Sequence, residues 1–168
     1  KSILQGRALR YGENPHQRGT YYGDFDALFE QLHGKELSYN NLVDVDAAIN
    51  LVHEFEGEKA FVIIKHTNAC GVATGSTVRE AYLKALQADT ISAFGGVLAT
   101  NQTIDQAAAE EINKLFFEIL IAPSFDESAL TILKSRKNRM ILLQKKQLTE
   151  ARQCKSILNG IIEQDLDL

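Results

Sequence analysis

A short apolar run, Phe61–Ile64, is the feature that most constrains how this chain can fold. The run consists of β-branched and aromatic residues and is too short for a helix, which predicts a buried strand. Two ionisable residues, Lys65 and His66, stand where this strand leaves the core. Residues 67–75 are mostly small or polar, and a segment of this kind predicts a loop that can fold closely around a ligand.

A helix is predicted to follow this loop, because Thr77 and Glu80 have the spacing of a capping box ahead of a helical apolar pattern. In an α/β sheet, a crossing from strand to helix lies at the carboxyl end of the strands, where ligands usually bind. The sequence therefore indicates that Lys65 and His66 lie at a reactive edge. The alternative is that the lysine is solvated at the rim and that the histidine is structural.

The overall composition excludes several classes of protein. The 168 residues are 45% hydrophobic and 24% charged, which is typical of a soluble globular domain. The net charge of −4 disfavours a broad surface for nucleic acid or for anionic membranes. Because no apolar run approaches the length of a spanning helix, we expect no membrane segment and no signal peptide. Two cysteines, Cys70 and Cys154, form neither a disulfide framework nor a C-x-x-C motif, so we expect a cytoplasmic location.

Helical and strand patterns alternate through most of the chain. This alternation predicts an α/β fold with a largely parallel sheet that helices cover on both faces. Helices are predicted over 42–55, 78–88, 104–114 and 124–134, and further strands over 97–99, 117–123, 140–144 and 160–164. Apart from Thr77, the predicted N-caps are Asn40 or Asn41, Thr103 and Ser124.

Three other features could bind a ligand or could be purely structural. The segment Arg7–Tyr22 lacks a helical period and is rich in arginine and tyrosine, as in a recognition loop between short extended pieces or in a solvated surface turn. Gly95 and Gly96 precede an apolar strand and indicate close approach to a neighbouring strand or to a ligand. Glu118 lies at the head of a predicted strand, where its carboxylate needs a partner, a ligand or water.

Several segments, taken together, resemble one family. They are Arg10–Gln17, Leu37–Leu42, Lys65–Gly71, Ser92–Gly96 and Ile121–Leu133, and they occur in the family's order. The family is the bifunctional purine-biosynthesis family, which joins an IMP cyclohydrolase to a phosphoribosyl-aminoimidazole-carboxamide (AICAR) formyltransferase. The resemblance implies that residues 1–168 are the first half of the formyltransferase domain, with a cytidine-deaminase-like, three-layer α/β/α fold. The cyclohydrolase domain and the second formyltransferase unit are then absent from this sequence.

The resemblance also implies an activity and a catalytic pair. The family moves a formyl group from 10-formyltetrahydrofolate, a co-substrate, to the 5-amino group of AICAR. Lys65 and His66 match its catalytic residues, with the imidazole as the base and the ammonium as the group that stabilises charge. Complete members are homodimers with sites between subunits, so we expect this piece alone to be inactive. Ala69 and Thr90 stand where the family commonly has proline, and neither is a reacting group.

The resemblance implies a set of substrate contacts as well. Arg10 and Tyr11 match residues that hold AICAR, with the arginine suited to a phosphate or a ring edge. Asn41, the backbone at Gly95 and Glu118 match further contacts to the nucleotide. Glu118 stands where relatives can have aspartate, which changes the reach of its carboxylate.

Two other functions remain open from the sequence. A zinc nucleoside deaminase would share the fold, but it needs H-x-E and P-C-x-x-C motifs, and neither occurs, so no metal is predicted. The sequence also lacks the glycine-rich motifs of Rossmann and Walker nucleotide sites. A non-catalytic module for nucleotide binding or oligomerisation is the second alternative.

Overall fold

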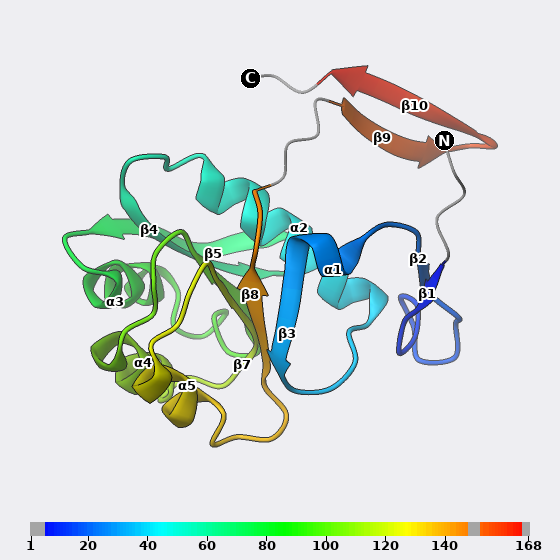
Figure 1. Cartoon of the computed structure of the whole chain (residues 1–168). Coiled ribbons are helices and arrows are strands. Elements are labelled where there is room, and N and C mark those ends of the chain that lie inside the picture. Colours follow the sequence, from blue (N-terminus) through cyan, green and yellow to red (C-terminus); the bar gives the residue numbers. More distant parts are fainter. Residues whose placement is uncertain (1–5, 148–151, 166–168) are drawn as a thin grey trace.

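A six-stranded sheet forms the centre of the protein, which we describe from a computed structural model over residues 6–147 and 152–165 (Figure 1). The strand order is β3-β8-β7-β6-β4-β5. In that order the strands are β3 (Phe29–His33), β8 (Met140–Gln144), β7 (Phe117–Ala122), β6 (Gly96–Thr100), β4 (Lys59–Lys65) and β5 (Asn68–Gly75). The three middle strands β8, β7 and β6 are parallel to one another, whereas β3 and β4 run in the opposite direction and β5 returns to the first. The predicted α/β sheet is therefore confirmed with a parallel centre, but it is mixed overall, because three of its five strand pairings are antiparallel.

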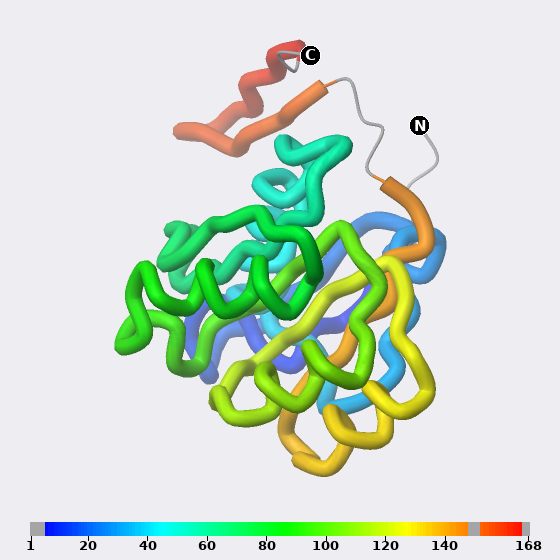
Figure 2. Tube along the Cα trace, turned by 90° about the vertical axis from the view of Figure 1, so that its left-hand side faces the viewer, coloured from blue at the N-terminus to red at the C-terminus, as the bar shows by residue number. Residues whose placement is uncertain are grey.

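Helices cover both faces of this sheet, as the two views in Figures 1 and 2 show. One face packs against α3 (Val78–Ala88), α4 (Gln106–Ile112) and α5 (Glu127–Leu133), and the other packs against α1 (Phe25–Leu28) and α2 (Tyr39–His53). The result is the predicted three-layer α/β/α arrangement.

Strand β4 shows why its sequence is an unbroken apolar run. Phe61 and Ile63 pack into the core beneath α3 and α4, whereas Val62 and Ile64 pack into the core beneath α2. Successive side chains of a strand point to opposite faces, so a strand covered on both sides needs apolar residues at every position. Each such side chain contributes roughly 1.5–3 kcal/mol by its burial.

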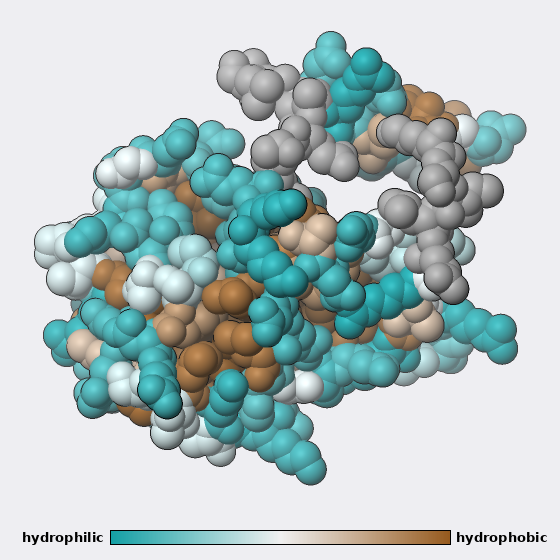
Figure 3. Space-filling view, in the orientation of Figure 1, coloured by the Kyte–Doolittle hydropathy of each residue, from teal (hydrophilic) through white to brown (hydrophobic). Residues whose placement is uncertain are grey.

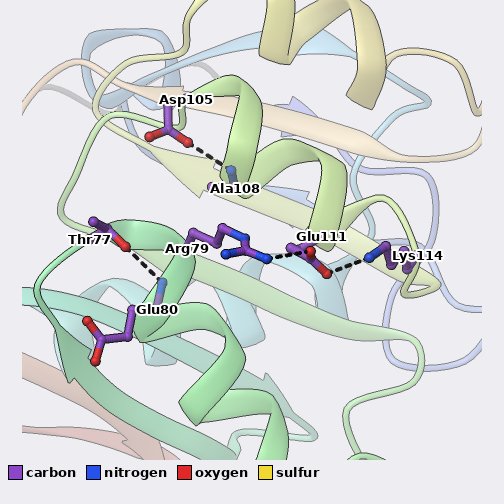
Figure 4. A network of polar contacts seen from close by, with 7 residues as sticks. All are labelled: Thr77, Arg79, Glu80, Asp105, Ala108, Glu111 and Lys114. Atoms are coloured by element: carbon purple, nitrogen blue, oxygen red, sulfur yellow. Dashed lines mark hydrogen bonds and ion pairs between the residues drawn. The ribbon is translucent and has the colours of Figure 1, made fainter.

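The start of α3 follows its predicted cap (Figure 4). Thr77 accepts the Glu80 backbone N–H at 3.1 Å, while the Glu80 carboxylate accepts the backbone N–H of Ser76 rather than that of Thr77. An ion pair of 2.9 Å between Arg79 and Glu111 then joins α3 to α4. The helix itself has the predicted bounds.

The other three predicted caps are wrong. The observed N-caps, with the predicted ones in parentheses, are Ser38 (Asn40 or Asn41), Asp105 (Thr103) and Asp126 (Ser124). The hydroxyls of Thr103 and Ser124 are hydrogen-bonded to each other, where the segments that lead into α4 and α5 run side by side. Each hydroxyl therefore binds its counterpart in place of a helix N–H.

The predicted loop over residues 67–75 is also wrong. Strand β4 turns back through His66 and Thr67 into β5, and the two strands form an antiparallel hairpin. Because β4 runs against β6, its carboxyl end lies beside the amino ends of the parallel strands. Lys65 and His66 therefore lie at the edge of the sheet opposite to the one predicted.

Two small hairpins complete the described fold. The strands β1 (Arg7–Ala8) and β2 (Thr20–Tyr21) are the short extended pieces predicted around the arginine-rich loop. The predicted strand near residue 160 is β10 (Gly160–Asp165), and it pairs with β9 (Arg152–Ile157), which the sequence did not indicate. Figures 1 and 2 both show this second hairpin beyond the layered body. Within residues 6–147 and 152–165, no helix has the length and apolarity needed to cross a membrane.

Candidate active site

The turn that carries His66 has an unusual backbone. His66 and Thr67 have φ of 50° and 63°, as in a two-residue type I′ hairpin turn, which normally uses asparagine and glycine. A left-handed backbone costs about 1–3 kcal/mol per residue of this kind unless the surroundings hold it. Asp44 of α2 accepts the Thr67 backbone N–H at 2.7 Å, and the Thr67 hydroxyl and the Asn68 amide donate to the His66 carbonyl at 2.6 and 2.8 Å. The exposed imidazole is thus presented on a restrained turn.

Lys65 lies at the end of β4, with its ammonium group directed to the segment before β6. Its Nζ donates to the Phe94 carbonyl at 2.8 Å. The pKa of the nearby Asp89 carboxyl is held below its usual range, mainly by hydrogen bonds from Ser92. The charge of the Lys65 ammonium adds to this effect. The lysine is half-buried, so its charge has a fixed position beside the turn.

Gly95 follows the carbonyl that binds Lys65. Its φ is +74°, a backbone conformation that favours glycine, and its N–H donates to the Phe116 carbonyl at 2.8 Å. A Cβ on the adjacent Gly96 would lie 2.9 Å from the Ile64 carbonyl, so the close approach made by this pair is to a neighbouring strand. A ligand at Gly95 would meet its carbonyl or Cα, because its N–H is already used.

Asn41 joins the start of α2 to the head of β7. Its side-chain oxygen accepts the Ser38 backbone N–H at 3.0 Å, and its own backbone N–H donates to the Ser38 hydroxyl at 3.3 Å. Its side-chain amide donates to Glu118 Oε2 at 2.9 Å. The asparagine is buried, whereas Glu118 is exposed. The carboxylate can therefore still accept hydrogen bonds from outside.

Arg10 and Tyr11 form a second unit at the same end of α2. The guanidinium lies 4.5 Å from the centre of the Tyr11 ring and donates to the Tyr11 hydroxyl at 2.7 Å. The loop is joined to the approach of α2, since the Arg10 N–H donates to Leu37 and the Tyr39 N–H donates to Tyr11. Within the described part of the chain, the buried Arg10 Nε has no hydrogen-bond partner. A ligand acceptor such as a phosphate could occupy this donor.

The first turns of α2 are what bring the predicted residues together. Asn41 and Asp44 are three positions apart and so share one face of the helix. The first contacts Glu118 and the second holds the turn of His66. Asp44 was not among the predicted site residues, because its sequence position is that of any polar residue on a helix surface.

The seven predicted residues do not close a cleft by themselves. Among the described residues, no side-chain hydrogen bond joins Arg10 or Tyr11 to Lys65 or His66. An open groove of about 450 Å³ lies beside the turn, but its lining comes from the neighbouring part of α2 and from Ile64 and residues 67–69. The structure therefore shows one sheet edge with the candidate groups along it.

The described residues also bear on the zinc alternative. Over 6–147 and 152–165, no three His, Cys, Asp or Glu side chains are grouped so that they could hold a metal ion. Cys70 is half-buried, and burial, followed by the nearby charge of Asp89, raises the pKa of its thiol. Among the described residues, Cys70 belongs to no such group.

Comparison with known proteins decides the family. The AICARFT/IMPCHase bienzyme family matches residues 1–168. The chain belongs to this family. The bifunctional purine biosynthesis protein PurH of Bacteroides thetaiotaomicron is 54% identical over 167 residues, which cover 99% of this chain and 33% of that protein. PurH proteins of Bacillus cereus and Bacillus thuringiensis are each 47% identical and cover 95% of this chain and 32% of their own length. This chain thus spans about a third of the length of the curated relatives that it matches.

Proposed function

We propose that this chain is part of an AICAR formyltransferase, within a protein that also carries IMP cyclohydrolase. Residues 1–168 would be the first half of the formyltransferase domain of a cytoplasmic homodimer. The observation that carries the proposal is the edge at the start of α2, where Asn41 binds Glu118 and Asp44 holds the turn beside Lys65. Membership of the AICARFT/IMPCHase family supplies the reaction.

The proposed reaction needs a base. The 5-amino group of AICAR is a poor nucleophile, because its lone pair is delocalised toward the carboxamide. As its nitrogen attacks the formyl carbon, its proton must leave, and the exposed His66 imidazole is the acceptor that the site presents. The new N–C bond forms, the bond from the formyl carbon to folate N10 breaks, and the proton finally resides on N10.

Lys65 would stabilise the charge that develops on the formyl oxygen during this transfer. Its ammonium is already held by the Phe94 carbonyl, so little reorganisation is required. The ammonium can also help to protonate the departing folate nitrogen. Acid–base assistance of this kind contributes about 10²–10⁴-fold, so the positioning of both substrates must supply much of the remaining acceleration.

The substrate contacts follow from the same edge. Arg10 offers a donor to the phosphate or a ring edge, and Tyr11 holds the guanidinium in place. Asn41 orients Glu118, which can accept from the hydroxyls or amines of the nucleotide. The backbone carbonyl at Gly95 provides a further acceptor. The folate pocket and the rest of the cleft would come from the other parts of the full-length protein and its partner subunit.

The test is formyl transfer by the full-length protein with Lys65→Ala and His66→Ala, measured from the tetrahydrofolate released. Each variant should lose roughly 10²-fold or more in turnover with an unchanged unfolding midpoint. Lys84→Ala and His33→Ala serve as matched controls, since both lie on other surfaces of the protein. Near-normal turnover in either site variant would refute its catalytic role. AICAR binding without any transfer by the unaltered protein would favour the non-catalytic module.

A further inference from the structure

We infer that Asp44 is a positioning residue for His66, a role whose catalytic consequence depends on the function proposed above. Asp44 Oδ1 accepts the backbone N–H of Thr67 at 2.7 Å. Thr67 directly follows the proposed base and shares its left-handed backbone. A carboxylate that fixes this N–H therefore also fixes the direction in which the His66 side chain leaves the turn.

The contact joins the turn to a rigid element. Asp44 lies in the second turn of α2, and its neighbour Val45 is buried, as are Ala48 and Ile49 further along the same helix. The helix is anchored by its capping box at Ser38 and by its packing on the sheet. Asp44 can therefore act as a fixed point for the hairpin that carries Lys65 and His66.

The other bonds within the turn cannot replace it. The Thr67 hydroxyl and the Asn68 amide both donate to the His66 carbonyl, so both groups move with the turn that they stabilise. Among the described residues, Asp44 provides the hydrogen bond that links the turn at His66 and Thr67 to α2. Non-glycine residues hold a positive φ when their surroundings over-determine it. Without the carboxylate, we expect the turn to relax and the imidazole to be displaced.

The experiment uses the full-length protein with four variants. Asp44→Ala should lower kcat for formyl transfer about 10- to 100-fold and leave KM for AICAR within about twofold, since misplacement of a reacting group affects the reaction more than substrate binding. Asp44→Asn keeps an oxygen acceptor and should retain most of the activity. Thr67→Gly, added to Asp44→Ala, should restore part of kcat, because glycine adopts a positive φ freely. Asp46→Ala is the control, since Asp46 is exposed on the same helix and bonds to Asn50.

A crystal structure of the Asp44→Ala variant gives a readout that does not depend on activity. Displacement of His66 from its positive φ supports the inference even if the unaltered protein transfers no formyl group, in which case the proposed function alone fails. An unchanged turn overturns the inference, whatever the activity. It is equally overturned if formyl transfer is present and Asp44→Ala matches Asp46→Ala, or if Thr67→Gly restores nothing.

Discussion

The side-chain amide of Asn41 donates to Glu118 Oε2 at 2.9 Å, so the start of α2 and the head of β7 are joined at the candidate site. The orientation of this amide is determined by Ser38, whose backbone N–H donates to the Asn41 oxygen. Asn41 is 5% exposed, whereas Glu118 is an exposed residue. The two partners of one hydrogen bond should therefore respond differently to substitution.

The first prediction compares Asn41→Ala with Glu118→Ala. The asparagine variant loses one of the two hydrogen bonds of the capping box. Its free energy of unfolding in urea should therefore be about 1–2 kcal/mol lower than that of the unaltered protein. The glutamate variant should stay within about 0.5 kcal/mol of the unaltered protein, because water replaces the exposed carboxylate. In the full-length protein, however, Glu118→Ala should weaken AICAR binding by about tenfold. Equal losses of stability in both variants would make Glu118 a structural residue.

The second prediction separates backbone strain from site geometry by comparing two glycines. Gly95 and Gly57 have similar positive φ values, +74° and +84°, and a Cβ would clash at neither. Replacement by alanine should therefore cost each about 1–2 kcal/mol of stability in thermal or urea unfolding. Gly95→Ala should also reduce formyl transfer, because it displaces the Phe94 carbonyl that binds Lys65. Gly57 lies just before the other end of β4, so Gly57→Ala should leave formyl transfer unchanged. A loss of activity in both variants contradicts the prediction.

The third prediction concerns Tyr82, which is 1% exposed and whose hydroxyl has no hydrogen-bond partner among the described residues. Burial first, and then the nearby charge of Glu111, raise the pKa of Tyr82 to about 12. An unfolded tyrosine ionises near pH 10, so between about pH 10 and 12 only the unfolded state loses this proton. The free energy of unfolding is therefore unaffected by this group below about pH 10 and decreases as the pH rises from about 10 to 12.

Tyr82→Phe removes both the unpaired hydroxyl and this pH dependence. At pH 7 the variant should be at least as stable as the unaltered protein, by up to about 1–2 kcal/mol, because a buried unsatisfied group is eliminated. At pH 11 its advantage should increase, since only the unaltered protein has a phenol to ionise at this position. Urea unfolding at both pH values measures the difference. A marked loss of stability at pH 7 would indicate that the hydroxyl has a partner.

The sequence could predict the elements whose signals are local. Phe61–Ile64 had to be a strand covered on both sides, and the helix over 78–88 carries its own cap and apolar period. The β4–β5 hairpin could not be predicted, because His66 and Thr67 have none of the usual signals for a turn with positive φ. The small residues that follow are explained by packing: a Cβ on Gly71 would clash with the Ala85 carbonyl of α3.

The candidate site was predictable to a similar extent. Lys65 and His66 stand out because ionisable residues end an apolar run, and family resemblance indicated the other contacts. Asp44 could not be distinguished from Asp46 in the sequence, since both are polar positions of one helix. Only the return of β4 into β5 brings the first of them to the turn. A contact between distant segments of this kind leaves no periodic signal.

The last prediction concerns the β9–β10 hairpin. Every residue of both strands is exposed, including Ile157, Ile161 and Ile162, and Figure 3 shows hydrophobic residues on this outlying part. An isolated two-stranded hairpin is marginally stable in water, so it should add little to the stability of the layered body. Deletion of residues 152–165 should therefore change the unfolding free energy of this chain by less than about 0.5 kcal/mol in urea. A Tyr82→Ala variant provides the contrast, because loss of a buried aromatic ring should cost about 3–5 kcal/mol. If the deletion costs as much as that core substitution, the hairpin must pack against the body.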